Sequence, residues 1–269
     1  MRKAFVLLSG GLDSTTCLHK AIFDYAPEYT TQSLSSIVRN NAQDPVFWVE
    51  AVSVYYGQRH KKEMDYAAKT CERLRIKHTI LDVGALLRGD AVMLTDDSRG
   101  KVDVPDISYD QIKGVSPTYV PFRNGLMLSA LTAHAQKWVN EKNKEVEIPG
   151  KYHPDDRSVS AGIYFGAHSE DAHNWAYPDC TPEFIGAMAN AIYIGSYMQI
   201  RLHTPLEWLN KTGVVSLGDE LGVRFEDTWS CYKGDEFHCG VCPTCRSRRE
   251  AFLEAGIDDP TIYQDSAEV

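Results

Sequence analysis

The sequence predicts an α/β protein with a doubly wound, mainly parallel sheet, followed by a small cysteine-rich C-terminal region. Short apolar runs alternate with helical patterns of about ten to fifteen residues along the first part of the chain, and strands separated in this way pair in parallel with helices on both faces. Four of the seven cysteines lie within residues 231–245. We therefore expect an α/β domain over 1–205 and a helical, cysteine-rich region over 206–269.

The expected elements follow from periodicity and composition. Apolar and β-branched runs predict strands over 5–8, 46–56, 77–83, 158–166 and 199–203. Apolar residues at helical spacing predict helices from about residue 14, and over 61–74, 124–139 and 182–197. Either Asp179 or Thr181 is expected to cap the last of these helices. The polar stretches 27–45 and 84–117 are expected to be connections, the first of them an insertion.

The stretch FVLLSGGLDS at residues 5–14 predicts a site for a phosphate or pyrophosphate. A buried strand stops at two glycines, and a helix begins directly after them. Glycines let the backbone approach a ligand, and the free N–H groups of a helix N-terminus attract anions. The stretch is neither a Walker loop nor a GxGxxG dinucleotide fingerprint; a tight turn without a ligand is the alternative. The expected binding residues are Leu8, Ser9, Gly10, Gly11, Leu12, Asp13, Ser14 and Thr15.

The clustered cysteines predict a structural zinc site. Their spacing is Cys231-x7-Cys239-x2-Cys242-x2-Cys245, and four thiolates fill all positions of a tetrahedral ion. Free or redox thiols and an iron–sulfur cluster are the alternatives. His238 is expected to be exposed to solvent or to lie outside the ligand set. The odd number of cysteines argues against a disulfide framework, so the remaining three, Cys17, Cys71 and Cys180, are expected to be packed thiols.

Three further groups of polar residues follow strands or precede helices, so we expect them to meet at one edge of the sheet. Their side chains suit phosphate contacts, base-edge recognition, acid–base chemistry or magnesium binding, and each group taken alone is also compatible with solvated loops or helix caps. The candidate substrate-binding residues are Tyr56, Gln58, Arg59, His60, Arg123, Asn124, Asp171, Tyr177 and Asp179.

The overall charge argues against several classes of partner. A formal net charge of −9 opposes non-specific binding to nucleic acid or to an anionic membrane surface. No apolar run approaches the roughly 20 residues that span a bilayer. The short apolar run near the N-terminus leads directly into the glycine loop and does not indicate a signal peptide. We therefore expect a cytoplasmic protein that acts on small molecules.

Taken together, the motifs resemble those of one family. SGGLDSTTC, YYGQRH, VPFRN, YPDCTPEF and a terminal SCY-x6-CGVCPTCRSR run occur in that family's order. From Ser9 to Arg248 the chain looks like a 7-cyano-7-deazaguanine synthase, within the N-type ATP pyrophosphatases. The resemblance implies an adenine nucleotide alpha hydrolase-like fold and an ATP-dependent carbon–nitrogen ligase. It also implies bound Mg²⁺ and Zn²⁺, a homodimer, and catalytic roles for Asp13, Ser14 and Arg123.

The activity implied by the resemblance is the conversion of 7-carboxy-7-deazaguanine and ammonia to 7-cyano-7-deazaguanine through an acyl-adenylate and an amide. Two positions depart from the family pattern: Phe122 stands where glycine is usual, and Thr181 where arginine is usual. We expect both near the substrate pocket, where they favour an alternative function. In this alternative, the chain is a diverged relative that stops at the amide or joins the 7-deazaguanine to a protein amine. A binding protein that has lost catalysis is a third hypothesis.

Overall fold

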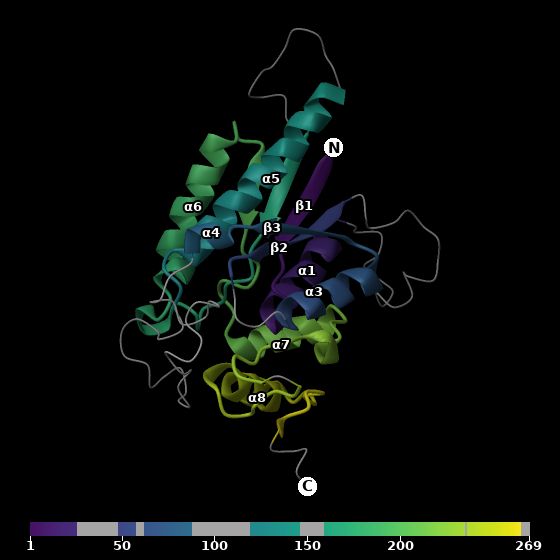
Figure 1. Ribbon diagram of the computed structural model, residues 1–269, viewed down its shortest axis with the longest axis vertical. Helices are drawn as coiled ribbons and strands as arrows, with labels where there is room; N and C mark the ends of the chain where they lie inside the picture. The colour runs from purple at the N-terminus through teal and green to yellow at the C-terminus, as the bar shows by residue number, and fades with distance from the viewer. Residues whose placement is uncertain (26–47, 58–61, 88–118, 146–158, 235, 265–269) are drawn as a thin grey trace.

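The computed structural model describes residues 1–25, 48–57, 62–87, 119–145, 159–234 and 236–264. Its centre is a five-stranded, entirely parallel sheet with the order β3-β2-β1-β4-β5 (Figure 1). This confirms the predicted α/β class. The strands are β1 (Arg2–Leu7), β2 (Val49–Tyr55), β3 (Lys77–Asp82), β4 (Ser160–Tyr164) and β5 (Ile200–His203).

Helices cover both faces of the sheet because alternate residues of β1 point to opposite sides. Ala4 and Val6 belong to the apolar cluster that also holds the buried residues of α1 and α3. Phe5 and Leu7 belong to a second cluster, formed with α5 and α6. The longer helices are α1 (Leu12–Tyr25), α3 (Lys62–Leu74), α5 (Arg123–Glu145), α6 (Pro182–Gly195), α7 (Lys211–Glu220) and α8 (Pro243–Ala255); α4 (Gly84–Leu87) is a single turn.

The predicted elements are present, but some bounds were wrong. The first strand begins at Arg2, because Arg2 and Lys3 pair with β4 although they are not apolar. The helix expected over 124–139 continues to Glu145. Thr181, and not Asp179, caps α6: its hydroxyl accepts a hydrogen bond from the Phe184 backbone. The stretch 27–45 and most of 84–117 lie outside the described residues.

The strand order determines where a ligand can bind. β1 lies between β2 and β4, so the chain winds outward in both directions from β1. Ligands of doubly wound sheets bind at such a switch point, beyond the carboxyl ends of the strands. The glycine loop follows β1 at this point, as the sequence predicts.

The C-terminal part of the chain packs on the same core. Leu206, Val214 and Val215 belong to the apolar cluster that contains β1 and α1, and α8 adds Phe252. α7 therefore rests against α1, and the cysteine region follows below it (Figure 1). The division at residue 205 stays a prediction.

Among the described residues, no helix combines the length and the apolar character that crossing a bilayer requires.

A buried ion-pair network ties the sheet together at Glu50 of β2. Its carboxylate accepts hydrogen bonds from Lys3 at 2.7 Å, from Thr79 at 2.8 Å and from His134 at 2.8 Å. Burial by itself would raise the pKa of Glu50, but the hydrogen bonds from Lys3 and His134 outweigh it and lower the pKa to about 2. The network joins β1, β2, β3 and α5.

Replacing Glu50 by glutamine leaves the buried Lys3 charge unpaired. We expect Glu50→Gln to lower the free energy of unfolding at pH 7 by about 3 kcal/mol, measured by urea denaturation. Glu141 provides the control, because it is exposed and lies 4.0 Å from Lys137. Glu141→Gln should change the free energy of unfolding by less than about 0.5 kcal/mol. Because the folded-state pKa is lowered, the contribution of Glu50 is complete above about pH 4.5 and disappears toward pH 2. A difference between wild type and variant that stays constant down to pH 3 would contradict this account.

Candidate functional site

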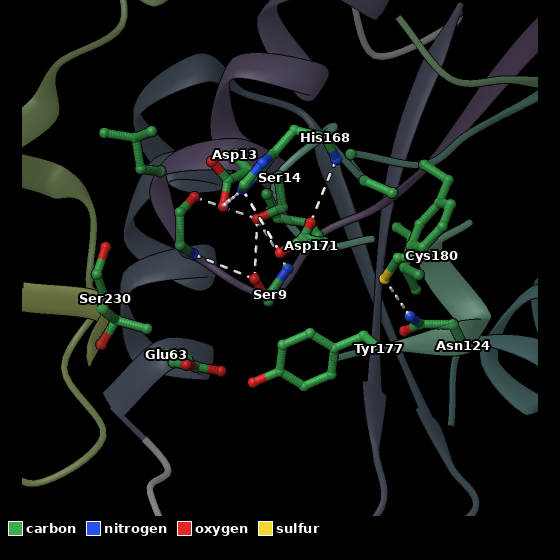
Figure 2. Close-up of a pocket in the computed structure, with 18 of the residues that line it drawn as sticks. Ser9, Asp13, Ser14, Glu63, Asn124, His168, Asp171, Tyr177, Cys180 and Ser230 are labelled. Atoms are coloured by element: carbon green, nitrogen blue, oxygen red, sulfur yellow. Dashed lines mark hydrogen bonds and ion pairs between the residues drawn. The ribbon is translucent and has the colours of Figure 1, made fainter. Parts of the chain in front are cut away.

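A cavity of about 260 Å³ opens at the carboxyl edge of the sheet, where the glycine loop leaves β1 (Figure 2). Its walls come from distant parts of the chain: the loop and α1, the first turns of α3 and α5, the segment after β4, the start of α7, and the segment that leads into the cysteines. The predicted site residues that line it are Leu8, Ser9, Gly11, Leu12, Asp13, Ser14, Tyr56, Arg123, Asn124, Asp171 and Tyr177.

The other predicted site residues lie elsewhere. Gly10 and Thr15 do not line the cavity, and Thr15 is fully buried. Asp179 is also buried and does not line the cavity, although its neighbour Cys180 does. Gln58, Arg59 and His60 lie outside the described residues.

Hydrogen bonds within the loop fix its shape. The Ser14 hydroxyl accepts from the Ser9 backbone N–H at 3.1 Å and donates to the Gly11 carbonyl at 3.2 Å. The Ser9 hydroxyl accepts from the Gly11 N–H at 3.2 Å. The loop leads directly into α1, whose first N–H groups have no partner within the helix. This geometry suits an anion beside the N-terminus of α1.

Gly10 is required by two features of the backbone. Its φ of +93° is a conformation that L side chains rarely adopt. A Cβ atom at this position would also meet the backbone oxygen of Glu63 at 2.0 Å, because the first turn of α3 packs directly on the loop. The Gly10 carbonyl in turn accepts a hydrogen bond from the Trp229 backbone at 2.9 Å. The loop therefore contacts α3 on one side and the approach to the cysteines on the other.

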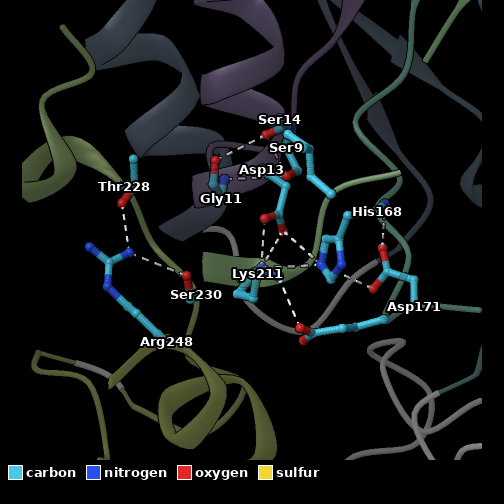
Figure 3. Close-up of polar contacts among 12 residues, drawn as sticks. Ser9, Gly11, Asp13, Ser14, His168, Asp171, Lys211, Thr228, Ser230 and Arg248 are labelled. Carbon is cyan, nitrogen blue, oxygen red and sulfur yellow. Dashed lines mark hydrogen bonds and ion pairs between the residues drawn. The ribbon is translucent and has the colours of Figure 1, made fainter. Parts of the chain in front are cut away.

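A lysine that the sequence analysis missed lies at the loop. Lys211, the first residue of α7, donates to both carboxylate oxygens of Asp13 at 2.6 and 2.7 Å (Figure 3). Its ammonium group is 3.4 Å from His168 Nε2, and His168 contacts Asp171 at 3.5 Å. Burial opposes the charge of Asp13, but Lys211 and then His168 outweigh it and lower the pKa of Asp13. Asp13 is therefore a carboxylate, with a cation beside it at the anion site.

Arg123 supplies a second cation to the cavity. It begins α5, and its guanidinium donates to the Tyr56 hydroxyl at 3.2 Å while lying 5.6 Å from the centre of that ring. Burial raises the pKa of Tyr56, so its hydroxyl stays protonated. An arginine held in this way is positioned to contact a phosphate or a carboxylate of a ligand.

The groups around Cys180 form a buried structural cluster. The carboxylate of Asp179 accepts from the Asn124 backbone N–H at 2.9 Å, and the Asn124 side chain donates to the Cys180 sulfur at 3.1 Å. Burial, then the charges of Asp171 and Asp179, raise the pKa of the Cys180 thiol well above its ordinary value. Asp179 therefore holds the start of α5, and Cys180 is a packed thiol rather than an activated nucleophile.

The two departures from the family pattern lie beside the cavity in sequence but do not line it, whereas their neighbours Arg123 and Cys180 do. Phe122 is 57% exposed, adopts a φ of +54°, and packs its ring edge-on to Phe184. Thr181 is occupied as the cap of α6, where its hydroxyl also donates to the Pro178 carbonyl. Neither residue lines the cavity.

The four C-terminal cysteines come together as the spacing predicts. The sulfur atoms of Cys231, Cys239, Cys242 and Cys245 lie within 4.8 Å of one another. Two pairs are 4.0 Å apart, close to the separation expected when four sulfurs surround one zinc ion at about 2.3 Å. Backbone N–H groups of Lys233, Gly234 and Cys239 point at the Cys231 sulfur, as they would toward a thiolate. The donor set therefore fits a closed tetrahedral metal site.

The metal region and the loop share one segment. His238 is buried, and its ring accepts a hydrogen bond from the Ser230 backbone at 3.1 Å, so it holds the chain that enters Cys231. The fully buried Arg248 donates to Thr228 at 2.8 Å and contacts Ser230 (Figure 3). Because the intervening Trp229 bonds Gly10, the cysteine fold supports the wall of the cavity.

Two glycines with similar backbone angles test the close contact at Gly10. Gly57 has a φ of +86°, and no atom of the described residues lies within 4 Å of its Cβ direction, whereas Gly10 faces the backbone of α3. We expect Gly10→Ala to lower the free energy of unfolding by about 2 kcal/mol more than Gly57→Ala, because only the first variant adds overpacking to strain. Equal losses in chemical denaturation would show that the contact with α3 is not limiting.

Comparisons with known proteins identify the family of this chain. Residues 33–147 and 155–256 match the family described as queuosine biosynthesis protein QueC. A 7-cyano-7-deazaguanine synthase of Ruegeria pomeroyi is 37% identical over 98% of this chain and 95% of its own length. One from a Marinomonas species is 34% identical over 97% and 98%, respectively. Among solved structures, a U34-tRNA thiolase of Methanococcus maripaludis aligns over 98% of this chain and 74% of its own, with 14% identity and a TM-score of 0.40. On the family match and the full-length relatives, the chain belongs to the QueC family of queuosine biosynthesis proteins.

Proposed function

We propose that the protein converts 7-carboxy-7-deazaguanine and ammonia to 7-cyano-7-deazaguanine, splitting ATP into AMP and pyrophosphate. The observation that carries the proposal is the glycine loop at the switch point of the sheet, with Lys211 and Arg123 on the same cavity. Two cations and a helix N-terminus are suited to an ATP triphosphate. The names of the full-length relatives supply the 7-deazaguanine substrate class.

In the proposed reaction, the phosphates of ATP lie at the glycine loop. A substrate carboxylate oxygen attacks the α-phosphorus of ATP, and the bond to the β-phosphate breaks. Loop N–H groups, Ser9, Ser14 and Lys211 then stabilise the departing pyrophosphate. Ammonia displaces AMP from the acyl-adenylate and forms the amide. A second activation, at the amide oxygen, allows loss of AMP and a proton to give the nitrile.

The acidic residues of the cavity suit Mg²⁺. Asp13 and Asp171 would hold the ion, and Mg²⁺ would supply positive charge to the phosphate oxygens. Lys211 pairs with Asp13 in the structure, so Asp13 exchanges one cation partner for another when it binds a metal.

A homodimer, a cytoplasmic location and the domain division at residue 205 belong to the same proposal. No feature of the described cavity favours the amide-forming or protein-conjugating alternative, because Phe122 and Thr181 do not line it.

The reaction is tested by mixing protein, ATP, Mg²⁺, 7-carboxy-7-deazaguanine and ammonium and measuring AMP, pyrophosphate and the product mass. We expect AMP only when the carboxylate is present, and a nitrile product. Lys211→Ala should slow AMP formation by about 100-fold, because it removes charge stabilisation of the leaving group. The exposed Lys137 serves as the matched control, and Lys137→Ala should leave the rate unchanged. Failure of the wild type to form AMP would refute the proposal; an amide or a conjugate as the final product would favour the alternative.

We also propose that the metal of the four-cysteine site is zinc, with a purely structural role, because all four ligands are protein sulfurs. One zinc ion per chain is expected by elemental analysis. Its removal by a chelator should greatly lower the unfolding temperature, since such sites contribute on the order of 10 kcal/mol to folding. Cys242→Ser should lose the metal, whereas Cys71→Ala, on α3, should retain it. Iron and inorganic sulfide in place of zinc would contradict this assignment.

A further inference from the structure

Glu63 has no role in the chemistry described so far, although it lines the cavity. It lies in the first turn of α3, and Figure 2 shows its carboxylate and the Tyr177 hydroxyl pointing toward each other. The position of Glu63 is fixed by its backbone, because its carbonyl oxygen packs against Gly10 of the loop. The residue is therefore held beside the anion site.

The other carboxylates of the cavity are already engaged. Asp13 bonds Lys211, Asp171 contacts His168, and Glu170 accepts the Lys211 backbone N–H at 3.0 Å. Within the described residues, Glu63 is the cavity carboxylate for which we find neither a hydrogen bond nor an ion pair. A carboxylate that lines the cavity and has no partner among the described residues is available to a cationic ligand.

The surroundings of Glu63 set its protonation. Burial raises the pKa of Glu63 to about 7, and the charge of Arg123 opposes this only in part. Tyr56, directly after β2, and Tyr177 also face the cavity. Burial raises the pKa of Tyr56, so its hydroxyl stays protonated. On its own helix, the Lys62 ammonium lies over the Trp229 ring, 4.5 Å from its centre. The carboxyl group can therefore gain and lose a proton near neutral pH.

Ammonia poses a problem that such a group solves. In neutral water it is mostly ammonium, which has no free electron pair and cannot attack an acyl-adenylate. We propose that Glu63 binds the ammonium ion and acts as the general base that deprotonates it; this rests on the proposed function. One proton passes from nitrogen to the Glu63 carboxylate, and the freed electron pair forms the C–N bond. The bond from carbon to the AMP oxygen breaks, and AMP leaves with the electron pair of that C–O bond. The surplus proton on the amide nitrogen goes to water.

Two nucleophiles separate this role from a structural one. Hydroxylamine is largely unprotonated at neutral pH and does not need a base before it attacks. We expect Glu63→Gln to slow amide formation from ammonium by about 100-fold while hydroxamate formation from hydroxylamine stays at the wild-type rate. Carboxylate-dependent exchange of pyrophosphate into ATP, which reports adenylation alone, should also be unchanged. Equal losses with both nucleophiles, or no loss with ammonium, would overturn the inference.

Controls distinguish the possible failures. Glu72→Gln removes an exposed carboxylate from the same helix and should leave both rates unchanged. Wild-type activity with saturating ammonium should fall on the acid side with a midpoint near pH 7, and this limb should be absent with hydroxylamine. Glu63→Asp should recover part of the ammonium rate. If the wild type shows no carboxylate-dependent exchange, the proposed function itself is refuted, and this inference with it; an intact exchange with normal ammonium use by Glu63→Gln refutes the inference alone.

Discussion

The close approach of the backbone at Gly10 is the constraint on which the site depends. At this residue the loop after β1 meets the first turn of α3 and accepts a hydrogen bond from Trp229, which directly precedes the cysteine region. The contacts at Gly10 thus position three parts of the cavity: the glycine loop, the first turn of α3 with Glu63, and the segment at Trp229 that leads into the cysteines. Four sulfurs would fill every position of a tetrahedral metal, so a metal at these cysteines would act on the cavity mechanically rather than chemically.

Charge balance explains the remaining architecture of the cavity. Asp13 is kept ionised by Lys211, and Arg123 is held by Tyr56, so cations border the cavity at the start of α7 and of α5. An acidic protein with a formal charge of −9 therefore presents a local environment suited to a triphosphate. The same surroundings leave Glu63 as a carboxylate whose proton affinity is set by burial rather than by an ion pair.

The parts of the site that could be predicted from the sequence are those whose residues all lie within a short stretch of the chain. The strand–glycine–helix pattern and the cysteine spacing each specify their own geometry. Lys211 could not be found in this way, because it lies 198 positions after Asp13 in the sequence and meets it only in the folded chain. A substrate contact for Asp179 stays a prediction: its residue type suggested one, and in the structure its carboxylate accepts a hydrogen bond from the backbone of Asn124 and does not line the cavity. Local sequence also does not say which way a side chain faces, so it could not show that Phe122 and Thr181 lie outside the lining of the cavity.

The central claim is that this cavity activates a carboxylate at the α-phosphorus of ATP. The most direct test is to supply 7-carboxy-7-deazaguanine with ¹⁸O in both carboxylate oxygens and to follow the label by mass spectrometry. The account predicts one ¹⁸O in each AMP formed, two labelled AMP molecules for every nitrile, and none in pyrophosphate. Label in pyrophosphate or orthophosphate, or unlabelled AMP, would contradict it.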